Sequence, residues 1–220
     1  MEEARMYHTV LFGLDGTLTD SAPGITNSVA YALRKWGIEE KNMEILRKFV
    51  GPPLDESFAK YYGFPPEKCW KAIEYYREYY LPKGIYENRV YDGIQELLEW
   101  LRSTGRRTIV ATSKPEPSAV RVLEHFQLAS YFDVIAGATM DGSRVKKSDV
   151  IRYALERAGI QDLAGTVMVG DRENDMEGAA ANGLASIGVL YGYGSRGELE
   201  GAGAVRIAET VEDLRECIES

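Results

Sequence analysis

Aspartate, threonine and lysine residues occur at several places where a short apolar segment ends or a helical pattern starts. These residues are Asp15, Thr112, Lys147, Asp171 and Asp175. The three aspartates suit Mg²⁺ chemistry, because this ion binds oxygen ligands. Each residue alone also has an ordinary structural explanation: Asp15 before Gly16 is a common turn pair, and Asp171 is a suitable helix N-cap. The candidate site therefore depends on whether the fold brings these side chains together.

Five short β-prone segments alternate with helical patterns over most of the chain. The β-prone segments are Tyr7 to Phe12, Arg107 to Ala111, Tyr131 to Ala136, Thr166 to Val169 and Ala185 to Leu190. The helical patterns cover residues 92–104, 116–127, 148–158, 173–182 and 210–218. This alternation predicts an α/β fold with a parallel sheet that is covered by helices on both faces. Ligands of such sheets bind beyond the carboxyl ends of the strands, so we expect the polar residues to meet at one edge.

Residues 19–86 differ from the rest, because they show helical patterns and no clear strand. Apolar residues from Val29 to Trp36 have helical spacing, and the pairs Pro52-Pro53 and Pro65-Pro66 interrupt the helices. The aromatic residues between 67 and 81 are expected to pack between these helices. We therefore predict a Rossmann-like core domain of residues 1–18 and 87–220, with a small helical cap domain of residues 19–86 inserted into it.

The composition is that of an ordinary globular protein. Of the 220 residues, 45% are hydrophobic and 27% are charged, and the formal net charge is −8. An acidic surface repels phosphate backbones, so nucleic acid is not an expected partner. No apolar segment approaches the ~18 residues that a membrane helix needs, and no membrane association is expected. Cys69 and Cys217 form no metal-binding pattern, which favours a cytoplasmic protein with free thiols. Nothing in the sequence predicts an oligomeric state.

Four motifs follow one another along the chain. The first is the apolar segment that ends in Gly13-Leu14-Asp15-Gly16-Thr17, the second is Thr112, the third is Lys146 or Lys147, and the fourth is Gly170-Asp171-Arg172-Glu173-Asn174-Asp175. In this order they resemble the motifs of the haloacid dehalogenase-like superfamily. The position of the cap and the segment Gly51-Pro52-Pro53-Leu54 are similar to its phosphoglycolate phosphatase and β-phosphoglucomutase branch. We choose Lys147 over Lys146, because Lys147 directly precedes the helix predicted near Ser148.

The resemblance implies a Mg²⁺-dependent phosphatase that acts on a small phosphorylated substrate. A carboxylate attacks the phosphate and forms an aspartyl-phosphate, which water then hydrolyses. Asp15 would protonate the leaving oxygen and later take a proton from the water, while its backbone carbonyl binds Mg²⁺. The carboxylates of Asp171 and Asp175 would complete the metal site. Thr112 would donate a hydrogen bond to the phosphate, and Lys147 would offset its negative charge.

Residue 13 departs from the pattern of this family, which places the nucleophilic aspartate there. Gly13 has no side chain, so it supplies neither a nucleophile nor a metal ligand. Loss of a covalent nucleophile typically costs on the order of 10⁴ or more in rate. We therefore expect a chain that is inactive as written and that keeps its phosphate pocket. The origin of Gly13 is an engineered change, a natural loss or a single-base error; the presence of all other motif residues favours a recent or artificial change.

Substrate contacts are expected from both parts of the chain. Candidates in the core are Gly16, Thr112, Ser113 and Lys147, and candidates in the cap are Arg47 and Gly51. Arg47 would pair with a second anionic group, although a solvated helix charge is an equally good explanation. Two alternatives to a phosphatase stay open: a non-catalytic protein that binds a phosphorylated ligand, and, ranked lower, a phosphomutase.

Overall fold

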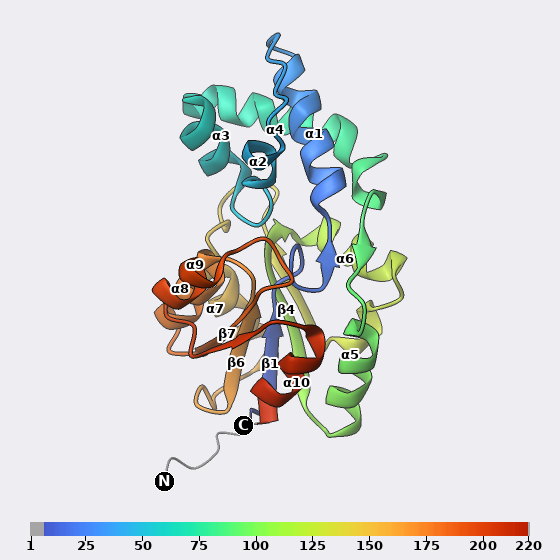
Figure 1. Cartoon of the computed structure of the whole chain (residues 1–220), viewed down its shortest axis with the longest axis vertical. Coiled ribbons are helices and arrows are strands. Elements are labelled where there is room, and N and C mark those ends of the chain that lie inside the picture. The colour runs from blue at the N-terminus through green and yellow to red at the C-terminus, as the bar shows by residue number, and fades with distance from the viewer. Residues whose placement is uncertain (1–6, 220) are drawn as a thin grey trace.

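The computed structural model describes residues 7–219 and contains a parallel sheet with helices on both faces (Figure 1). Among these residues, six strands form the sheet in the order β5-β4-β1-β6-β7-β8. The strands are β1 (Thr9–Phe12), β4 (Arg107–Pro115), β5 (Val134–Ala138), β6 (Thr166–Gly170), β7 (Ala185–Val189) and β8 (Arg206–Ala208). The predicted fold class, a Rossmann-like parallel sheet with an inserted helical cap, is confirmed.

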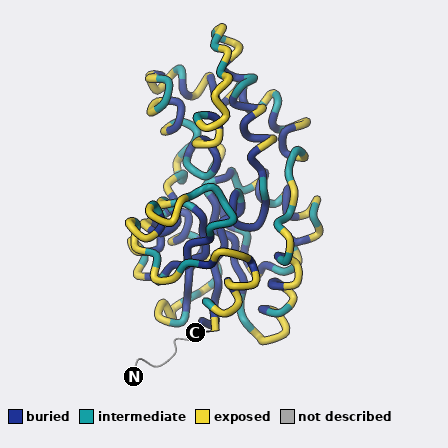
Figure 2. Tube along the Cα trace, viewed as in Figure 1, coloured by how far each residue is buried: buried dark blue, intermediate teal, exposed yellow. Residues whose placement is uncertain are grey.

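The central strands align their carboxyl ends at one edge of the sheet. Phe12, the last residue of β1, pairs in register with Val110 of β4 and with Val169 of β6. Every residue of β1 and β6 is buried, as expected for strands covered on both faces, and Figure 2 shows this buried centre. The segments that follow these three strands therefore start side by side.

Helices on the two faces bury alternate residues of the strands. One face packs Leu11 and Met168 against α7 (Lys147–Ala158) and α8 (Glu173–Ala181). The other packs Val10 and Phe12 in one cluster with α5 (Ile94–Ser103), α6 (Glu116–His125) and α10 (Val211–Glu219). This alternation follows from the two-residue period of side chains along a strand.

Three details of the core differ from the prediction. Strand β8 and helix α9 (Arg196–Gly201) were not predicted, because both are short and rich in charged or glycine residues. Strand β4 does not end at Ala111 but continues to Pro115, with a shift of register against β5. Residues 112–114 therefore lie within the strand. The extension was not predicted, because the residues after Ala111 are polar.

The inserted segment contains helices α1 (Ala22–Arg34), α2 (Met43–Arg47), α3 (Leu54–Tyr62) and α4 (Pro66–Tyr80), followed by the short 3₁₀ helix η1 (Gly84–Tyr86). In Figure 1 they lie together beyond the carboxyl edge of the sheet. The expectation of no strand in residues 19–86 is wrong at one place: β2 (Thr19–Asp20) pairs antiparallel with β3 (Arg89–Val90). This two-stranded ribbon links the two segments that connect the core to the cap.

Aromatic side chains fill the interior of the cap. Phe58 and Phe64 stack with ring centroids 5.8 Å apart, and Phe49 contacts Phe58 edge to face. The expected packing role of the aromatic residues of α4 is wrong for Trp70, whose residue surface is 43% exposed. None of the helices within residues 7–219 is long and apolar enough to cross a membrane.

Candidate active site

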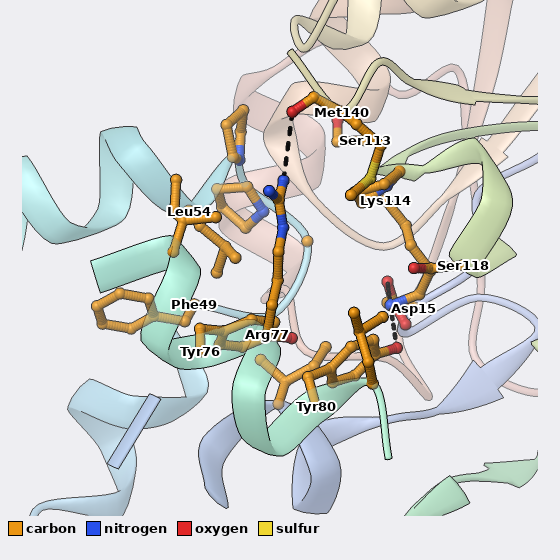
Figure 3. A pocket seen from close by; sticks show the side chains of 17 residues that line it. Asp15, Phe49, Leu54, Tyr76, Arg77, Tyr80, Ser113, Lys114, Ser118 and Met140 are labelled. Carbon is orange, nitrogen blue, oxygen red and sulfur yellow. Dashed lines mark hydrogen bonds and ion pairs between the residues drawn. The ribbon is translucent and has the colours of Figure 1, made fainter. Parts of the chain in front are cut away.

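Two neighbouring cavities lie at the carboxyl edge of the sheet, and Asp15 lines both. The first, here named the core cavity, is lined by Gly13, Leu14, Asp15, Gly51, Thr112, Lys147, Asp171, Arg172, Asn174 and Asp175. The second, the cap cavity, lies between the cap helices and the core and is shown in Figure 3. The fold therefore brings the aspartates, threonine and lysine of the four motifs to one place.

The loop after β1 is a tight turn that its backbone holds in place. The Gly13 N–H donates to the Val169 carbonyl at 2.9 Å, and the Gly16 N–H donates to the Thr19 carbonyl at 2.8 Å. Gly16 has φ +80°, a left-handed conformation that favours glycine. A Cβ on Gly16 would lie 2.1 Å from Asp171 Oδ2, so only glycine permits this approach. Gly16 thus fits closely against Asp171, although it does not line the core cavity.

Asp15 forms a buried ion pair with a lysine from β4. Its Oδ2 lies 3.0 Å from Nζ of Lys114, and both side chains are less than 10% exposed. The same Nζ donates to the hydroxyl of Tyr80, from cap helix α4, at 2.7 Å. Burial alone would lower the pKa of Lys114, but Asp15 and Tyr80 raise it by more, so Lys114 stays charged. A core aspartate is thereby linked to the cap through one ammonium group.

Asp171 and Asp175 place two carboxylates close together in the protein interior. Burial, followed by the negative charge of Asp175, raises the pKa of Asp171 to about 7. The backbone N–H of Tyr193 donates to Asp171 Oδ2 at 2.9 Å and opposes this rise. Negative charge at Asp171 is therefore incompletely compensated by the protein.

The start of α8 fixes Asp175 and, through it, Lys147. Asp175 Oδ2 accepts hydrogen bonds from the N–H groups of Asp171 and Arg172, each at 3.1 Å. Its Oδ1 lies 2.8 Å from Nζ of Lys147, which also donates to the Ala111 carbonyl at 3.1 Å. The N-cap of α8 is Arg172, so the alternative explanation of Asp171 as the N-cap is wrong.

The two lysines considered for the third motif have different positions. Lys147 is buried and lines the core cavity, whereas Lys146 is the exposed N-cap of α7 and lines a neighbouring surface cavity. Thr112 is also buried in the core cavity, where its Oγ1 accepts a hydrogen bond from the Lys114 N–H at 3.1 Å. Ser113, in contrast, lines the cap cavity.

The two cap residues predicted to bind substrate also differ in their placement. Gly51 lines both cavities, and its φ of +106° favours glycine. Arg47 is exposed and lines neither cavity at Asp15; it borders a separate cleft with Tyr191 and Arg172. The structure thus provides no contact between Arg47 and the candidate active site.

Gly13 borders the core cavity with room for a side chain. A Cβ at this position would lie 3.6 Å from Asp175 Oδ1 and 3.0 Å from Thr17 Oγ1. Gly13 is not among the glycines with positive φ, so its backbone accepts other residues. A Cβ at residue 13 therefore needs only a small shift of Thr17.

A divalent cation fits these residues in part. Among residues 7–219, no group of three or more histidine, cysteine, aspartate or glutamate side chains is arranged to hold a metal ion. Asp171 and Asp175 nevertheless offer two carboxylates, and the raised pKa of Asp171 indicates that a cation would stabilise its charge. The buried Oδ1 of Asp15 also has no hydrogen-bond partner. A cation such as Mg²⁺ binds about six oxygen atoms, and Gly13 adds no carboxylate to this set.

Comparison with known proteins identifies the family. Residues 10–189 match the model of the haloacid dehalogenase-like hydrolases, which covers the inserted helices and the sheet apart from β8. The chain belongs to the haloacid dehalogenase-like hydrolases. The resemblance inferred from the motifs is thereby confirmed at the level of the family.

Relatives of this haloacid dehalogenase-like hydrolase are similar over its whole length. A Pseudomonas aeruginosa protein named 5'-nucleotidase is 43% identical over 219 residues, which are 100% of this chain and 99% of the relative. Tyrosine-protein kinase PtkA of Mycobacterium tuberculosis is 43% identical over 213 residues, covering 95% of this chain and 72% of the relative. The crystal structure of a predicted phosphatase from Clostridium acetobutylicum is 52% identical, with a TM-score of 0.95 over 97% of this chain and 98% of that one.

Two charged residues at the site of this haloacid dehalogenase-like hydrolase escaped the sequence analysis. Lys114 directly follows Thr112-Ser113, but the predicted strand ended at Ala111, and a lysine beyond a strand end is usually solvated. Arg77 lines the cap cavity from α4. Its position four residues after Ile73 places it on the same face of α4 as that buried residue, but nothing in the sequence indicated that this face meets the core.

Proposed function

We propose that this chain is a Mg²⁺-dependent phosphatase scaffold for a small phosphorylated metabolite, disabled in its catalytic step at residue 13. The observation that supports the proposal is the set of residues around the core cavity. Gly13, Asp15, Thr112, Lys147, Asp171 and Asp175 come from four separate segments and line that one cavity. Family membership and relatives named as phosphatases support the reaction class.

In the proposed reaction the phosphate group binds in the core cavity. The Thr112 hydroxyl donates a hydrogen bond to a phosphoryl oxygen, and the ammonium of Lys147 offsets its negative charge. Mg²⁺ held by Asp171, Asp175 and the Asp15 carbonyl would neutralise part of the charge of the phosphate. The burial of Lys147 strengthens its interaction with an anion, because little water screens it.

Asp15 is the proposed acid and base. It protonates the leaving oxygen and then takes a proton from the attacking water. The ammonium of Lys114 lies 3.0 Å from Oδ2 of Asp15. The same contact fixes the direction of the Asp15 side chain, which points toward both cavities.

Residue 13 is the proposed position of the nucleophile. An aspartate there would start from a Cβ 3.6 Å from Asp175 Oδ1, at the wall of the core cavity. Asp15 does not replace it in the proposed geometry, because its carboxylate faces the leaving oxygen of the phosphate. The unmodified chain is therefore expected to bind phosphorylated ligands and to hydrolyse them at least about 10⁴-fold more slowly than Gly13→Asp.

The test compares the unmodified chain, Gly13→Asp and Gly13→Asn with Mg²⁺. Asparagine matches aspartate in size but does not attack phosphorus, so Gly13→Asn controls for filling the space. The substrates are 4-nitrophenyl phosphate, nucleoside 5'-monophosphates, sugar phosphates and phosphoglycolate; the nucleotides are included because one relative is named 5'-nucleotidase. We expect turnover by Gly13→Asp alone. Metal-dependent turnover by the unmodified chain would overturn the proposed role of residue 13.

The second candidate function is binding of a phosphorylated ligand without turnover. It is favoured by one observation: the groups proposed to hold phosphate, Thr112 and Lys147, are in place although residue 13 lacks a carboxylate. If Gly13→Asp is inactive on every substrate and the unmodified chain still binds phosphates, this second function replaces the first. A phosphomutase ranks lower, as no second phosphate position is indicated.

A further inference from the structure

The cap cavity continues from Asp15 to the surface and has mainly apolar walls. Its apolar and aromatic lining comprises Ile25, Phe49, Pro52, Pro53, Leu54, Ile73, Tyr76, Tyr80, Leu81, Pro115 and Met140. A shallow groove shares Leu54, Arg77 and Met140 with this cavity and reaches Trp70 at the surface. The empty space between the lining side chains is about 620 Å³, part of it open to solvent. Such walls favour an apolar ligand over one with many hydroxyl groups.

Arg77 is the charged group on the cap side of this cavity and has no carboxylate partner among the described residues. Its guanidinium makes one long hydrogen bond, to the Met140 carbonyl at 3.4 Å. Burial lowers the pKa of Arg77 by more than the negative charge of Glu74 raises it, so this cation has lost water without full compensation. Figure 3 shows its side chain extended toward Met140, while Asp15, Lys114 and Tyr80 lie together at another end of the cavity. The other cation of the cavity, Lys114, is already paired with Asp15.

The cap side of the cavity has aromatic walls that are suited to a flat ligand. The rings of Tyr76 and Tyr80 are stacked 5.1 Å apart, and both residues are buried at the cavity wall. A guanidinium has five N–H donors in one plane and binds carboxylate or carbonyl oxygens at the edge of a planar group. Most of these donors on Arg77 remain available to a ligand.

From this arrangement we infer that the cap cavity selects phosphate monoesters whose leaving group has an apolar, planar body and an anionic or carbonyl oxygen at its far edge. The inference rests on the proposed function, since it places the phosphate in the core cavity. Arg77 is then the residue that determines specificity, and polyhydroxylated sugar phosphates are poor ligands. A carboxylate edge and a nucleobase carbonyl edge present the same acceptor chemistry to Arg77.

The test is binding to the unmodified chain in the presence of Mg²⁺, measured by calorimetry. Phenyl phosphate and 4-carboxyphenyl phosphate differ only in the edge carboxylate, while uridine 5'-monophosphate supplies carbonyl oxygens. We expect 4-carboxyphenyl phosphate to bind at least about tenfold more tightly than phenyl phosphate. Arg77→Met should remove this difference and leave the affinity for phenyl phosphate within about twofold. Lys71→Met, an exposed lysine on the same helix, is the matched control and should change neither affinity.

Equal affinity for the two aryl phosphates, or equal losses for both in Arg77→Met, would overturn the inference. A separate measurement distinguishes this failure from failure of the proposed function. Binding of 4-hydroxybenzoate, which has no phosphate, is followed by ligand-observed NMR with the same variants. If no phosphate binds but 4-hydroxybenzoate binding requires Arg77, the proposed phosphate site is wrong and the specificity of the cap cavity stands. If no phosphate binds and 4-hydroxybenzoate binding does not require Arg77, the proposed phosphate site and the proposed specificity of the cap cavity are both wrong.

Discussion

Lys114 Nζ lies 3.0 Å from Asp15 Oδ2, with the side chains 4% and 8% exposed. Two charges so deeply buried are stable mainly as a pair, because either one alone would lose its hydration without compensation. Tyr80 adds a hydrogen bond from the cap to the same ammonium. The pair therefore connects the proposed acid and base with the element that covers it.

Lys114→Met is expected to destabilise the protein by about 3–5 kcal/mol, because it leaves the Asp15 carboxylate buried without a cation. Urea denaturation followed by circular dichroism measures the loss. Lys71→Met is the control, since Lys71 forms a surface ion pair with Glu74 and should cost less than about 1 kcal/mol. Equal costs for the two variants would show that burial of the Lys114–Asp15 pair has no energetic consequence.

Stability in EDTA is expected to fall as the pH rises from about 4 to about 7, through the ionisation of Asp171. The pKa of this carboxyl is raised from 3.8 to about 7 in the folded state, by burial and by Asp175. Between these values the folded protein binds more protons than the unfolded chain, so raising the pH favours unfolding. Asp171→Asn should flatten this part of the curve of unfolding free energy against pH.

Exposed Asp92 provides the control for that measurement. Asp92→Asn should keep the slope of the unmodified chain, because an exposed carboxyl has a similar environment in the folded and unfolded states. A curve for Asp171→Asn that is parallel to that of the unmodified chain would show that Asp171 does not titrate in this range.

Gly13→Asp is expected to make the stability depend strongly on Mg²⁺. A third carboxylate beside Asp171 and Asp175 adds repulsion in EDTA and adds a ligand when the ion is present. Thermal unfolding should show a lower Tm than that of the unmodified chain in EDTA and a larger rise on addition of Mg²⁺. Gly197→Asp adds the same charge where no atom lies within 4 Å of the new Cβ and should show no such dependence. Equal Mg²⁺ effects in both variants would exclude a metal site at residue 13.

Gly192→Ala is expected to cost about 1–3 kcal/mol or more, because the loop after β7 has no room for a methyl group. A Cβ on Gly192 would lie 2.3 Å from the Gly16 carbonyl oxygen and 2.4 Å from Cβ of Asp171. Gly197→Ala, with no atom within 4 Å, should cost nothing measurable in the same urea denaturation. If Gly192→Ala is equally harmless, the contact between this loop and the turn after β1 is looser than described.

Periodicity in the sequence was sufficient to predict five of the six strands of the sheet, and the family motifs named the residues expected at its carboxyl edge. Asp15, Thr112 and Asp171 closely follow apolar segments, and parallel pairing then places them together regardless of the details of packing; Lys147 instead begins helix α7. The cap contribution was not predictable in this way. Arg47 and Arg77 are both arginines of cap helices, and which one faces the core depends on how the helices pack.

Side-chain identity also hid part of the site from sequence reasoning. The run Thr112-Ser113-Lys114-Pro115 is polar and ends in proline, features that indicate the end of a strand. The bulge in β4 lets the strand continue and buries Lys114 against Asp15. Only the charge of Asp15, distant in the sequence, makes that burial favourable.

The position of β1 has a consequence for the order in which the chain can fold. β1 precedes the other described strands in the chain, yet it lies in the middle of the sheet between β4 and β6. Neither partner exists until the ribosome has passed the whole cap, because their pairing with Thr9 involves Arg107 and Thr166. The helices of the cap make contacts that are local in sequence and can form early, whereas the nascent β1 must wait for both partners. The proposed catalytic loop, which directly follows β1, therefore reaches its final shape only late in folding.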